Sequence, residues 1–285
     1  MLDKIFEIYK QAMPDVMRGE EKVKSILEAC RIITVDADDR TVGFSAVHEN
    51  TIYLLCVEEG FRGRGLGSEL LRRSEEYISS RGFDKVRLGA GQEYIVPGVP
   101  MGDGVHEFFK KRGYVHWWGD AGCFDMSLDL KNFSENSVGD TIHGITYRWA
   151  SKKDISDVLA CVKDAEESFV QYYTDERFYE AEHDTAVLVA EEAGEIIGAI
   201  QVSREVEKKG VGTVGCTATM KKHRGRGIAG GLVMSGTKHL KNAGMSGAFL
   251  GYTYTAILNI YGRAGYKICA EYFMGEKFLP DANQG

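Results

Sequence analysis

The fold is decided by the stretch Phe61-Arg62-Gly63-Arg64-Gly65-Leu66-Gly67, because a close copy, His223-Arg224-Gly225-Arg226-Gly227-Ile228-Ala229, follows 162 residues later. The same spacing continues through the next apolar helical pattern and through the strand after it. A shorter spacing of 152 residues relates Gly113-Tyr114 to Gly265-Tyr266, so the first copy carries ten extra residues between about Gly91 and Glu107. The chain is therefore predicted to contain two copies of one domain.

Strands are expected before each glycine-rich stretch, at 32–36, 41–47 and 51–57 and again at 186–191, 196–203 and 211–220. Ser151 looks like a helix start in the second copy, whereas the first copy begins directly with a helix. The segment 91–107 holds two of the four prolines and is interpreted as a rigid loop, and the polar segment 131–141 as a linker.

Composition limits the function. The chain has 285 residues, 44% hydrophobic and 27% charged, as expected for globular domains, and its net charge of −7 argues against nucleic-acid binding. The six cysteines form no CxxC pair, so neither a metal site nor a disulfide framework is expected, and we interpret the chain as cytoplasmic. No apolar run approaches the roughly 20 residues that a membrane span needs, so no membrane partner is expected.

Each glycine-rich stretch lies between a predicted strand and a predicted helix, which is the arrangement of a phosphate-binding loop. Glycine permits positive φ and close approach of a ligand, and the free N–H groups at a helix start favour an anion. The arginines add positive charge. A P-loop would need GxxxxGK[ST], and no lysine follows these glycines. A dinucleotide fold would need GxGxxG with an acidic residue further on, and the GxGxG spacing of the first copy does not fit that pattern.

The pattern R-x-x-G-x-G/A in this position resembles the GNAT acetyltransferase superfamily. The resemblance implies an α/β (α+β) chain of two tandem GNAT folds, at 1–135 and 142–285, each with a mixed central sheet flanked by helices. It also implies that backbone amides of each loop hold the pyrophosphate of acetyl-CoA, with no metal. The cofactor-binding residues expected from it are Leu55, Val57, Arg62, Gly63, Arg64, Gly65, Leu66, Gly67 and Ser68 in the first copy, and Thr217, Thr219, Arg224, Gly225, Arg226, Gly227, Ile228, Ala229 and Gly230 in the second.

The resemblance further implies an acyl-CoA N-acyltransferase in which an amine attacks the thioester directly. The strand before the loop supplies a backbone N–H for the oxyanion, and a tyrosine four residues before the terminal Gly-Tyr protonates the CoA thiolate. Tyr261 occupies that position in the second copy and Phe109 in the first, so catalysis is assigned to the second copy through Tyr261. The chain departs from the family at Tyr254, where many members have asparagine.

The acceptor and the general base are not fixed by these residues. The segment 166–176 mixes aromatic residues with carboxylates, which favours a small primary amine such as a polyamine, an amino sugar or an amino-acid derivative. Candidate bases are Glu58, Glu59, Glu191, Glu192 or a water. Trp117-Trp118 is expected to pack between domains, and the chain to be a monomeric pseudo-dimer or a homodimer. Three alternatives stay open: catalysis by the first copy, CoA sensing without catalysis, and nucleotide binding.

Overall fold

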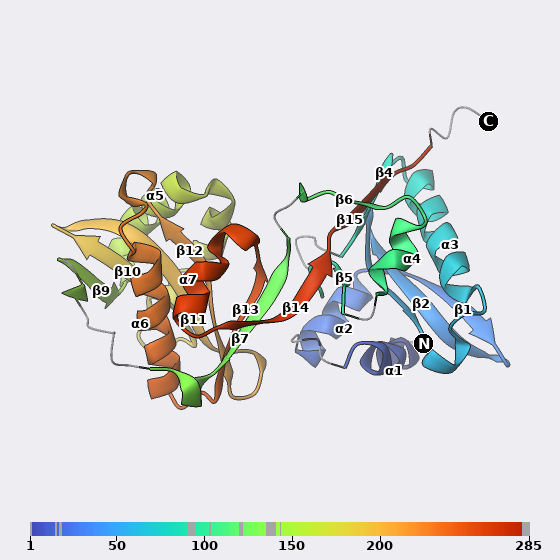
Figure 1. Cartoon of the computed structure of the whole chain (residues 1–285), viewed down its shortest axis with the longest axis horizontal. Helices are drawn as coiled ribbons and strands as arrows, with labels where there is room; N and C mark the ends of the chain where they lie inside the picture. The colour runs from blue at the N-terminus through green and yellow to red at the C-terminus, as the bar shows by residue number, and fades with distance from the viewer. Residues whose placement is uncertain are drawn as a thin grey trace. The chain divides into compact units, whose positions relative to one another are not determined.

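The computed structural model describes residues 2–14, 16, 19–89, 95–102, 104–119, 122–134, 141–142 and 144–280. The chain forms two compact units (Figure 1). Unit 1 consists of Met1–Cys123 and Ala270–Gly285, and unit 2 of Phe124–Cys269. These units differ from the predicted ranges 1–135 and 142–285, because each unit contains a strand from the other half of the sequence.

Unit 1 is built on a six-stranded sheet in the order β1-β2-β3-β4-β15-β6. The C-terminal strand β15 therefore lies between two strands from the N-terminal half and pairs antiparallel with both. The strands are β1 Arg31–Ala37, β2 Arg40–His48, β3 Thr51–Val57, β4 Lys85–Leu88, β6 Val115–His116 and β15 Gly275–Phe278, and the helices are α1 Leu2–Ala12, α2 Glu20–Glu28, α3 Leu66–Ser80 and α4 His106–Lys110.

Helices α3 and α1 both pack on the unit 1 sheet. Leu70 and Ile78 of α3 are fully buried against apolar residues of β1 to β4, and Ser74 of α3 donates a hydrogen bond to Ser45 of β2. Side chains alternate between the faces of a strand, so Phe44 of β2 points to the face opposite Ser45. Helix α1 contacts β2 and β3 and buries its apolar stripe, including Ile5.

Unit 2 has a sheet in the order β14-β7-β13-β12-β11-β10-β9-β8. Strand β7 comes from the end of the N-terminal half and pairs antiparallel with β13. The last residues of β14, Tyr272 and Phe273, pair with the short strand β5 within unit 1. The bounds are β5 Val99–Pro100, β7 Phe124–Asp129, β8 Thr141–Ile142, β9 Ile145–Trp149, β10 Thr185–Glu192, β11 Glu195–Lys208, β12 Val211–Thr219, β13 Gly247–Thr253, β14 Lys267–Phe273, α5 Ile155–Ala165, α6 Ile228–Asn242 and α7 Leu258–Arg263.

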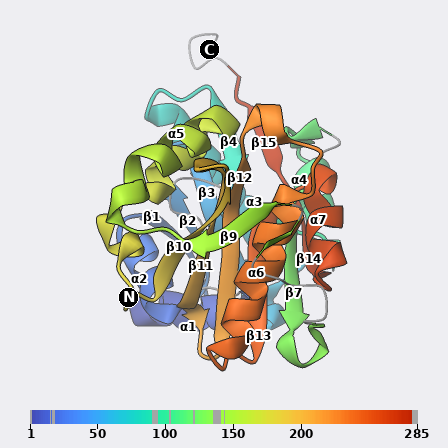
Figure 2. The same ribbon diagram turned by 90° about the vertical axis from the view of Figure 1, so that its left-hand side faces the viewer.

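The alternation of β10 places α5 and α6 on opposite faces of the unit 2 sheet, as Figure 2 shows. Leu188 and Ala190 pack with α6, whereas Val187 and Val189 pack with α5. Gly231 lets α6 lie directly on β9, because an added Cβ would collide with the phenol ring of Tyr147.

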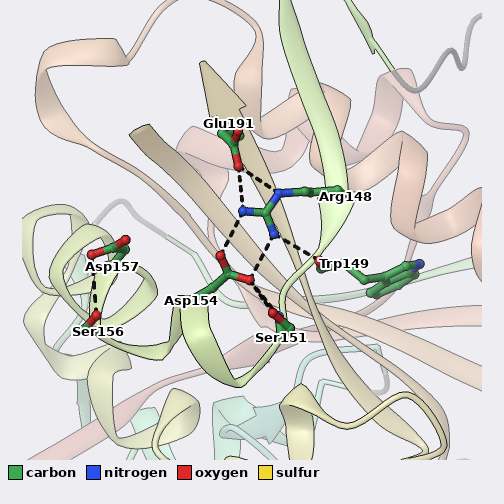
Figure 3. Close-up of polar contacts among 7 residues, drawn as sticks. All are labelled: Arg148, Trp149, Ser151, Asp154, Ser156, Asp157 and Glu191. Carbon is green, nitrogen blue, oxygen red and sulfur yellow. Dashed lines mark hydrogen bonds and ion pairs between the residues drawn. The ribbon is translucent and has the colours of Figure 1, made fainter. Parts of the chain in front are cut away.

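The start of α5 is fixed to the sheet by a polar cluster (Figure 3). Asp154 accepts hydrogen bonds from the backbone and hydroxyl of Ser151, which form a capping box, and pairs with both terminal nitrogens of Arg148 on β9. Arg148 also pairs with Glu191 at the end of β10. These bonds hold the pKa of Asp154 well below its usual range, the bond from Arg148 contributing most.

Most of the elements expected from the sequence are present, with bounds within about two residues, except that β11 runs to Lys208. The turn between β1 and β2 contains Asp38 and Asp39 at φ of 50° and 58°, and the turn between β10 and β11 contains Ala193 and Gly194 at 51° and 84°. The predicted loop 91–107 lies partly outside the described residues, but 95–98 is not helical and α4 starts at His106. Residues 135–140 of the predicted linker are also outside the described part. Among the described residues, no helix is both long and apolar enough to cross a membrane.

Candidate functional site

The glycine-rich loop of unit 1 leaves a row of backbone N–H groups without acceptors. Gly63 and Gly65 have φ of 77° and 85°, which bends the chain into the start of α3. The first helical hydrogen bond runs from Glu69 N–H to Gly65 O at 3.0 Å. Within the described part of the chain, no hydrogen bond from the backbone N–H groups of residues 63–68 is found. These donors, with the positive end of the helix dipole, form a cradle for an anion.

The loop of unit 2 has the same geometry. Gly225 and Gly227 have φ of 81° and 82°, and the first bond of α6 runs from Gly231 N–H to Gly227 O at 3.0 Å. The N–H groups of residues 225–230 have no acceptor among the described residues. The N–H donors of both loops are therefore not used in hydrogen bonds among the described residues, and binding of a diphosphate by these residues stays a prediction.

The first arginine of each loop turns back toward the protein. Arg62 donates from Nε to the carbonyl of Val57 at 3.0 Å, and Arg224 donates to Thr219 at 3.4 Å and to Ala165, at the end of α5, at 2.8 Å. These side chains hold the loops in place. The sequence predicted only that they add charge.

The second arginines differ between the units. Arg226 forms a two-pronged ion pair with Glu192, with nitrogen to oxygen distances of 2.6 and 2.9 Å, and approaches Nδ1 of His223 at 2.8 Å. In unit 1, Arg64 lies 4.9 Å from the centre of the Phe61 ring and donates to Gly60 O. The positive charge is therefore paired with a carboxylate in the cradle of unit 2. In unit 1 no ion pair to Arg64 is found among the described residues.

Next to the cradle of unit 2, two parallel strands separate. Among the described residues, β12 and β13 pair at 211–213 with 247–249 only, although β12 continues to Thr219 and β13 to Thr253. In unit 1, β3 and β4 pair at 51–52 with 87–88 and β3 continues to Val57, whereas β4 ends at Leu88 and residues 90–94 lie outside the described part of the chain. A split between parallel strands leaves the edge of the longer strand available to an extended ligand.

The N–H groups at the end of the longer strand face the split. Glu58 N–H donates to Val42 O on β2, and Met220 N–H donates to Ile197 O on β11. Since N–H groups alternate between the two edges of a strand, those of Val57 and Thr219 point to the opposite edge. The same alternation directs Leu55 N–H to the edge of β3 that faces away from β2. A backbone N–H at such a free edge is able to act as an oxyanion donor, and that role of these residues stays a prediction.

Tyr261 lies at the same end of unit 2 and carries a phenol that keeps its proton at neutral pH. Its side chain is on α7 and its hydroxyl lies 3.0 Å from Oγ1 of Thr217, a residue of β12. Burial raises the pKa of Tyr261 to about 12, and the hydrogen bond from Thr217 acts in the opposite direction. A tyrosine with a protonated hydroxyl and the strand end that faces the split thus lie in the same part of unit 2.

The corresponding end of unit 1 has no such donor. Phe109 is buried and packs edge-on against Tyr114. The partly buried Leu55 packs on the same apolar cluster, which includes Val57 and Phe109. Three positions that are Thr217, Thr219 and Tyr261 in unit 2 are therefore apolar in unit 1.

Three of the four candidate bases are engaged in ion pairs. Glu58 pairs with Arg40 and Lys4, and the bond from Arg40 lowers its pKa most. Glu192 pairs with Arg226, which lowers its pKa. Glu191 pairs with Arg148. A carboxylate with a lowered pKa is a weak proton acceptor, so these ion pairs disfavour Glu58 and Glu192 as the general base.

The aromatic segment predicted to meet the acceptor divides into two parts. Tyr173 is fully buried and donates to the carbonyl of Cys216 at 2.6 Å, and Tyr179 donates to the carbonyl of Tyr173. Tyr172 is 46% exposed and meets Phe169 edge-on. The buried part supports β12, and only the exposed part is available to a ligand. Trp117 and Trp118 stack on each other, with Arg87 over Trp117, and their packing between domains stays a prediction.

Two contacts of the site were not anticipated from the sequence, namely the bond between Thr217 and Tyr261 and the ion pair between Arg226 and Glu192. The first leaves a signal in the sequence, because both of its positions become apolar in the other copy. Among the described residues, no group of three or more His, Cys, Asp or Glu side chains is arranged to hold a metal ion.

Comparisons with known proteins agree with this geometry. The model of the acetyltransferase (GNAT) family matches residues 154–266, and the GNAT acetyltransferase domain model matches residues 28–116. None of the curated proteins matches the chain.

Three solved structures illustrate the fold. One is the glucosamine N-acetyltransferase region of a fungal multi-domain GH3 beta-N-acetylglucosaminidase, with TM-score 0.77 and 22% identity over 96% of this chain and 36% of that one. The second is an N-acetyltransferase from Sphaerobacter thermophilus, with TM-score 0.69 and 19% identity over 97% and 92%. The third is a tandem GNAT protein from the clavulanic acid biosynthesis pathway, with TM-score 0.68 and 13% identity over 99% and 97%.

The fold, the cradles and the two family matches define a tandem pair of acetyltransferase domains. The chain belongs to the GNAT family, whose members are acyl-CoA N-acyltransferases.

Proposed function

We propose that this protein transfers an acetyl group from acetyl-CoA to a primary amine of a small molecule, and that unit 2 catalyses the transfer. The buried hydroxyl of Tyr261 beside the open end of β12 carries this proposal. In unit 1 the corresponding residue is Phe109, which cannot donate a proton. The cradle N–H groups at 225–230, and the matching group at 63–68, support binding of the diphosphate of CoA.

The residues of unit 2 suit direct transfer. In this proposal, the N–H of Thr219, which points away from β11, stabilises the negative charge that the thioester oxygen gains. Tyr261 supplies the proton that the CoA sulfur takes when the carbon–sulfur bond breaks. A primary amine with a pKa of about 10.4 must first lose a proton, and water serves as its acceptor because the nearby glutamates are paired.

An amino sugar is the acceptor class that we favour among the small amines. One of the similar structures is described as a glucosamine N-acetyltransferase region. The exposed ring of Tyr172 and the carboxylates of Glu166 and Glu167 suit an acceptor that combines an ammonium group with a flat ring face. The proposal includes action in the cytoplasm, as a monomer or a homodimer.

The test is cleavage of acetyl-CoA in the presence of different amines, followed as release of free thiol. Glucosamine, spermidine and lysine methyl ester represent three acceptor classes. We expect thiol release that depends on the amine and is fastest with glucosamine. If calorimetry detects binding of acetyl-CoA but no amine supports its cleavage, the protein binds CoA without catalysis, and the proposal is wrong.

Catalysis by unit 1 is the second candidate, and one observation favours it. Its cradle arginine Arg64 has no ion pair to a carboxylate among the described residues, unlike Arg226. This observation supports stronger binding of CoA in unit 1. It does not identify a residue of unit 1 that could donate a proton to the CoA sulfur. The two candidates are separated by reversing the charge in each cradle, with the variants Arg64→Glu and Arg226→Glu. Only the variant in the catalytic unit is expected to raise KM for acetyl-CoA.

A further inference from the structure

The hydrogen bond between Thr217 and Tyr261 joins the hydroxyl of a half-buried threonine to a buried phenol. Tyr261 is 3% exposed and belongs to the apolar cluster beneath α6 and α7. A buried phenol that lacks a partner is costly, and the hydroxyl of Thr217, 3.0 Å away, supplies one. The two residues lie on separate elements, β12 and α7, so the bond fixes the phenol relative to the strand.

A bulge in β12 directs Thr217 toward Tyr261. Ala199 pairs with Ala218 and Gln201 with Gly215, so two residues of β12 stand opposite one residue of β11. Cys216 has a φ of 50°, which is unusual for a residue other than glycine. The buried Tyr173 donates to its carbonyl at 2.6 Å and holds the bulge from the side of α5. Bulges of this kind re-aim the side chains beside them.

Unit 1 lacks both ends of this bond. With the spacing of 162 residues, Thr217 corresponds to Leu55, and with the spacing of 152 residues, Tyr261 corresponds to Phe109. Strand β3 pairs regularly with β2 from Leu54 to Val57, and its bulge lies earlier, at Tyr53. Unit 1 therefore packs at these two positions with side chains that have no hydroxyl group. We infer from this that the hydroxyls of Thr217 and Tyr261 have a role in unit 2 other than packing.

We propose that Thr217 is a positioning residue for acetyl transfer, which holds the phenol of Tyr261 toward the leaving sulfur and stabilises the phenolate after the proton has left. This inference rests on the proposed function. The new carbon–nitrogen bond forms, the carbon–sulfur bond breaks, and sulfur takes the proton of Tyr261. The Thr217 hydroxyl then donates to the phenolate. The proton lost by the acylated nitrogen passes to water, and Tyr261 regains a proton from water.

The direction of the pKa shifts agrees with this role. Burial raises the pKa of Tyr261, which keeps the phenol protonated, and the Thr217 hydroxyl partly offsets that rise. Without Thr217, the phenol becomes a weaker acid and loses its fixed direction. The proton transfer slows, while the cradle that binds the diphosphate is unchanged.

A double-mutant cycle in the full chain tests the proposal, with acetyl-CoA and glucosamine or a faster amine from the panel as substrates. The variants are Thr217→Val, Thr217→Ser, Tyr261→Phe and the Thr217→Val, Tyr261→Phe double variant. We expect Thr217→Val to lower kcat up to roughly tenfold, the range of one hydrogen bond, with KM for acetyl-CoA within about twofold. Thr217→Ser restores kcat. In the Tyr261→Phe background, Thr217→Val lowers kcat no further.

Thr237 provides a matched control. Its hydroxyl lies 3.0 Å from that of Tyr266, and both residues are buried in the same unit. Thr237→Val breaks a bond of the same kind on α6 and is expected to leave kcat within about twofold, whatever it does to stability. This control separates loss of a buried hydroxyl in general from loss of the one beside Tyr261.

Two results would overturn the role of Thr217: an unchanged kcat for Thr217→Val, or an equal fractional loss with and without the Tyr261 hydroxyl. If Thr217→Val fails to fold, the test uses Thr217→Ser and the Thr217→Ser, Tyr261→Phe double variant instead. A kcat of Thr217→Ser that is below half the kcat of the unaltered protein then contradicts the proposal. A different result, an unchanged kcat for Tyr261→Phe alone, removes Tyr261 from the mechanism and contradicts the proposed function.

Discussion

Single side chains separate the two units more sharply than their backbones do. In both cradles, no acceptor for the loop N–H groups is found among the described residues, and in both units the longer of two parallel strands continues beyond the paired residues. At equivalent positions of the repeat, unit 2 has Tyr261 and unit 1 has Phe109. The repeat in the sequence made this difference visible, because the spacing to the Gly-Tyr pair identifies equivalent positions. The hydrogen bond of Tyr261 was not predictable, since it depends on a bulge and on the placement of α7.

Replacement of the proposed proton donor is the first prediction. Tyr261→Phe should lower kcat roughly 100-fold, the lower range for loss of a general acid, while the affinity for acetyl-CoA stays within about twofold. Steady-state rates and titration calorimetry measure the two quantities. Tyr114→Phe is the control in unit 1, where the hydroxyl donates to Glu75, and its kcat should not change. A matching loss in the control would indicate a general effect on folding.

At the scale of elements, the turn between β10 and β11 acts on the cradle of unit 2. Glu192 at the end of β10 pairs with Arg226 and brings a negative charge close to the proposed phosphate-binding loop. We expect Glu192→Gln to tighten acetyl-CoA binding roughly threefold at low salt, and less at high salt because the groups are partly exposed. Calorimetry at two salt concentrations measures this effect.

Glu195→Gln is the control for this prediction, because it removes the same charge from the same turn and its carboxylate pairs with Lys222. Its acetyl-CoA affinity should change less than that of Glu192→Gln. Weaker binding by Glu192→Gln would contradict the prediction and would mean that the carboxylate holds Arg226 in its binding position. The loop itself followed from the sequence, but the ion pair depends on a turn 34 residues away along the chain.

The start of α5 depends on the Asp154 cluster. Asp154→Asn removes the negative charge that pairs with Arg148. Because the Asp154 side chain is buried and that of Arg148 is partly exposed, we expect the unfolding free energy to fall by about 2 kcal/mol at pH 7. The folded-state pKa of Asp154 is lowered, so its contribution is complete above the unfolded value of about 3.9 and is lost as the pH falls below it. Denaturant curves at pH 7, 5 and 3 should show a smaller difference between the two proteins at pH 3 than at pH 5 or 7, because the contribution is lost progressively down to the lowered folded-state pKa.

Asp157 tests whether charge alone explains such a loss. It lies one turn further along α5, and its carboxylate only approaches the Ser156 hydroxyl, at 3.5 Å (Figure 3). Asp157→Asn should change the unfolding free energy by less than about 0.5 kcal/mol. A constant difference between Asp154→Asn and the unaltered protein from pH 7 to pH 3 would mean that the ion pair does not stabilise α5.

At the scale of the whole molecule, the sequence predicted two mixed sheets with helices, and the turns and strands fell close to the expected positions. It did not predict the exchange of strands, in which β7 completes unit 2 and β15 completes unit 1. Local patterns identify a strand and its faces, but they do not identify which sheet the strand joins. The predicted boundary near residue 135 followed the polar composition of 131–141, whereas the units divide before Phe124.

Unit 1 should therefore depend on the C-terminus. Strand β15 lies between β4 and β6, where Glu276 pairs with Arg87 and Lys85, and Lys277 contacts Glu75 at 3.0 Å. A chain that ends at residue 274 loses this strand from the middle of a sheet, so we expect the unit 1 transition to disappear from thermal unfolding.

A chain that ends at residue 280 keeps β15 and is the matched control, with an expected melting temperature close to that of the full chain. Hydrogen exchange localises the effect, because amides of β3 and β4 should lose protection when residues 275–285 are missing, whereas those of β10 and β11 should keep it. The 1–135 fragment lacks β15 in the same way and should also fail to fold cooperatively. Full protection of β4 in the chain ending at 274 would contradict the dependence, because the sheet would then be stable without its exchanged strand.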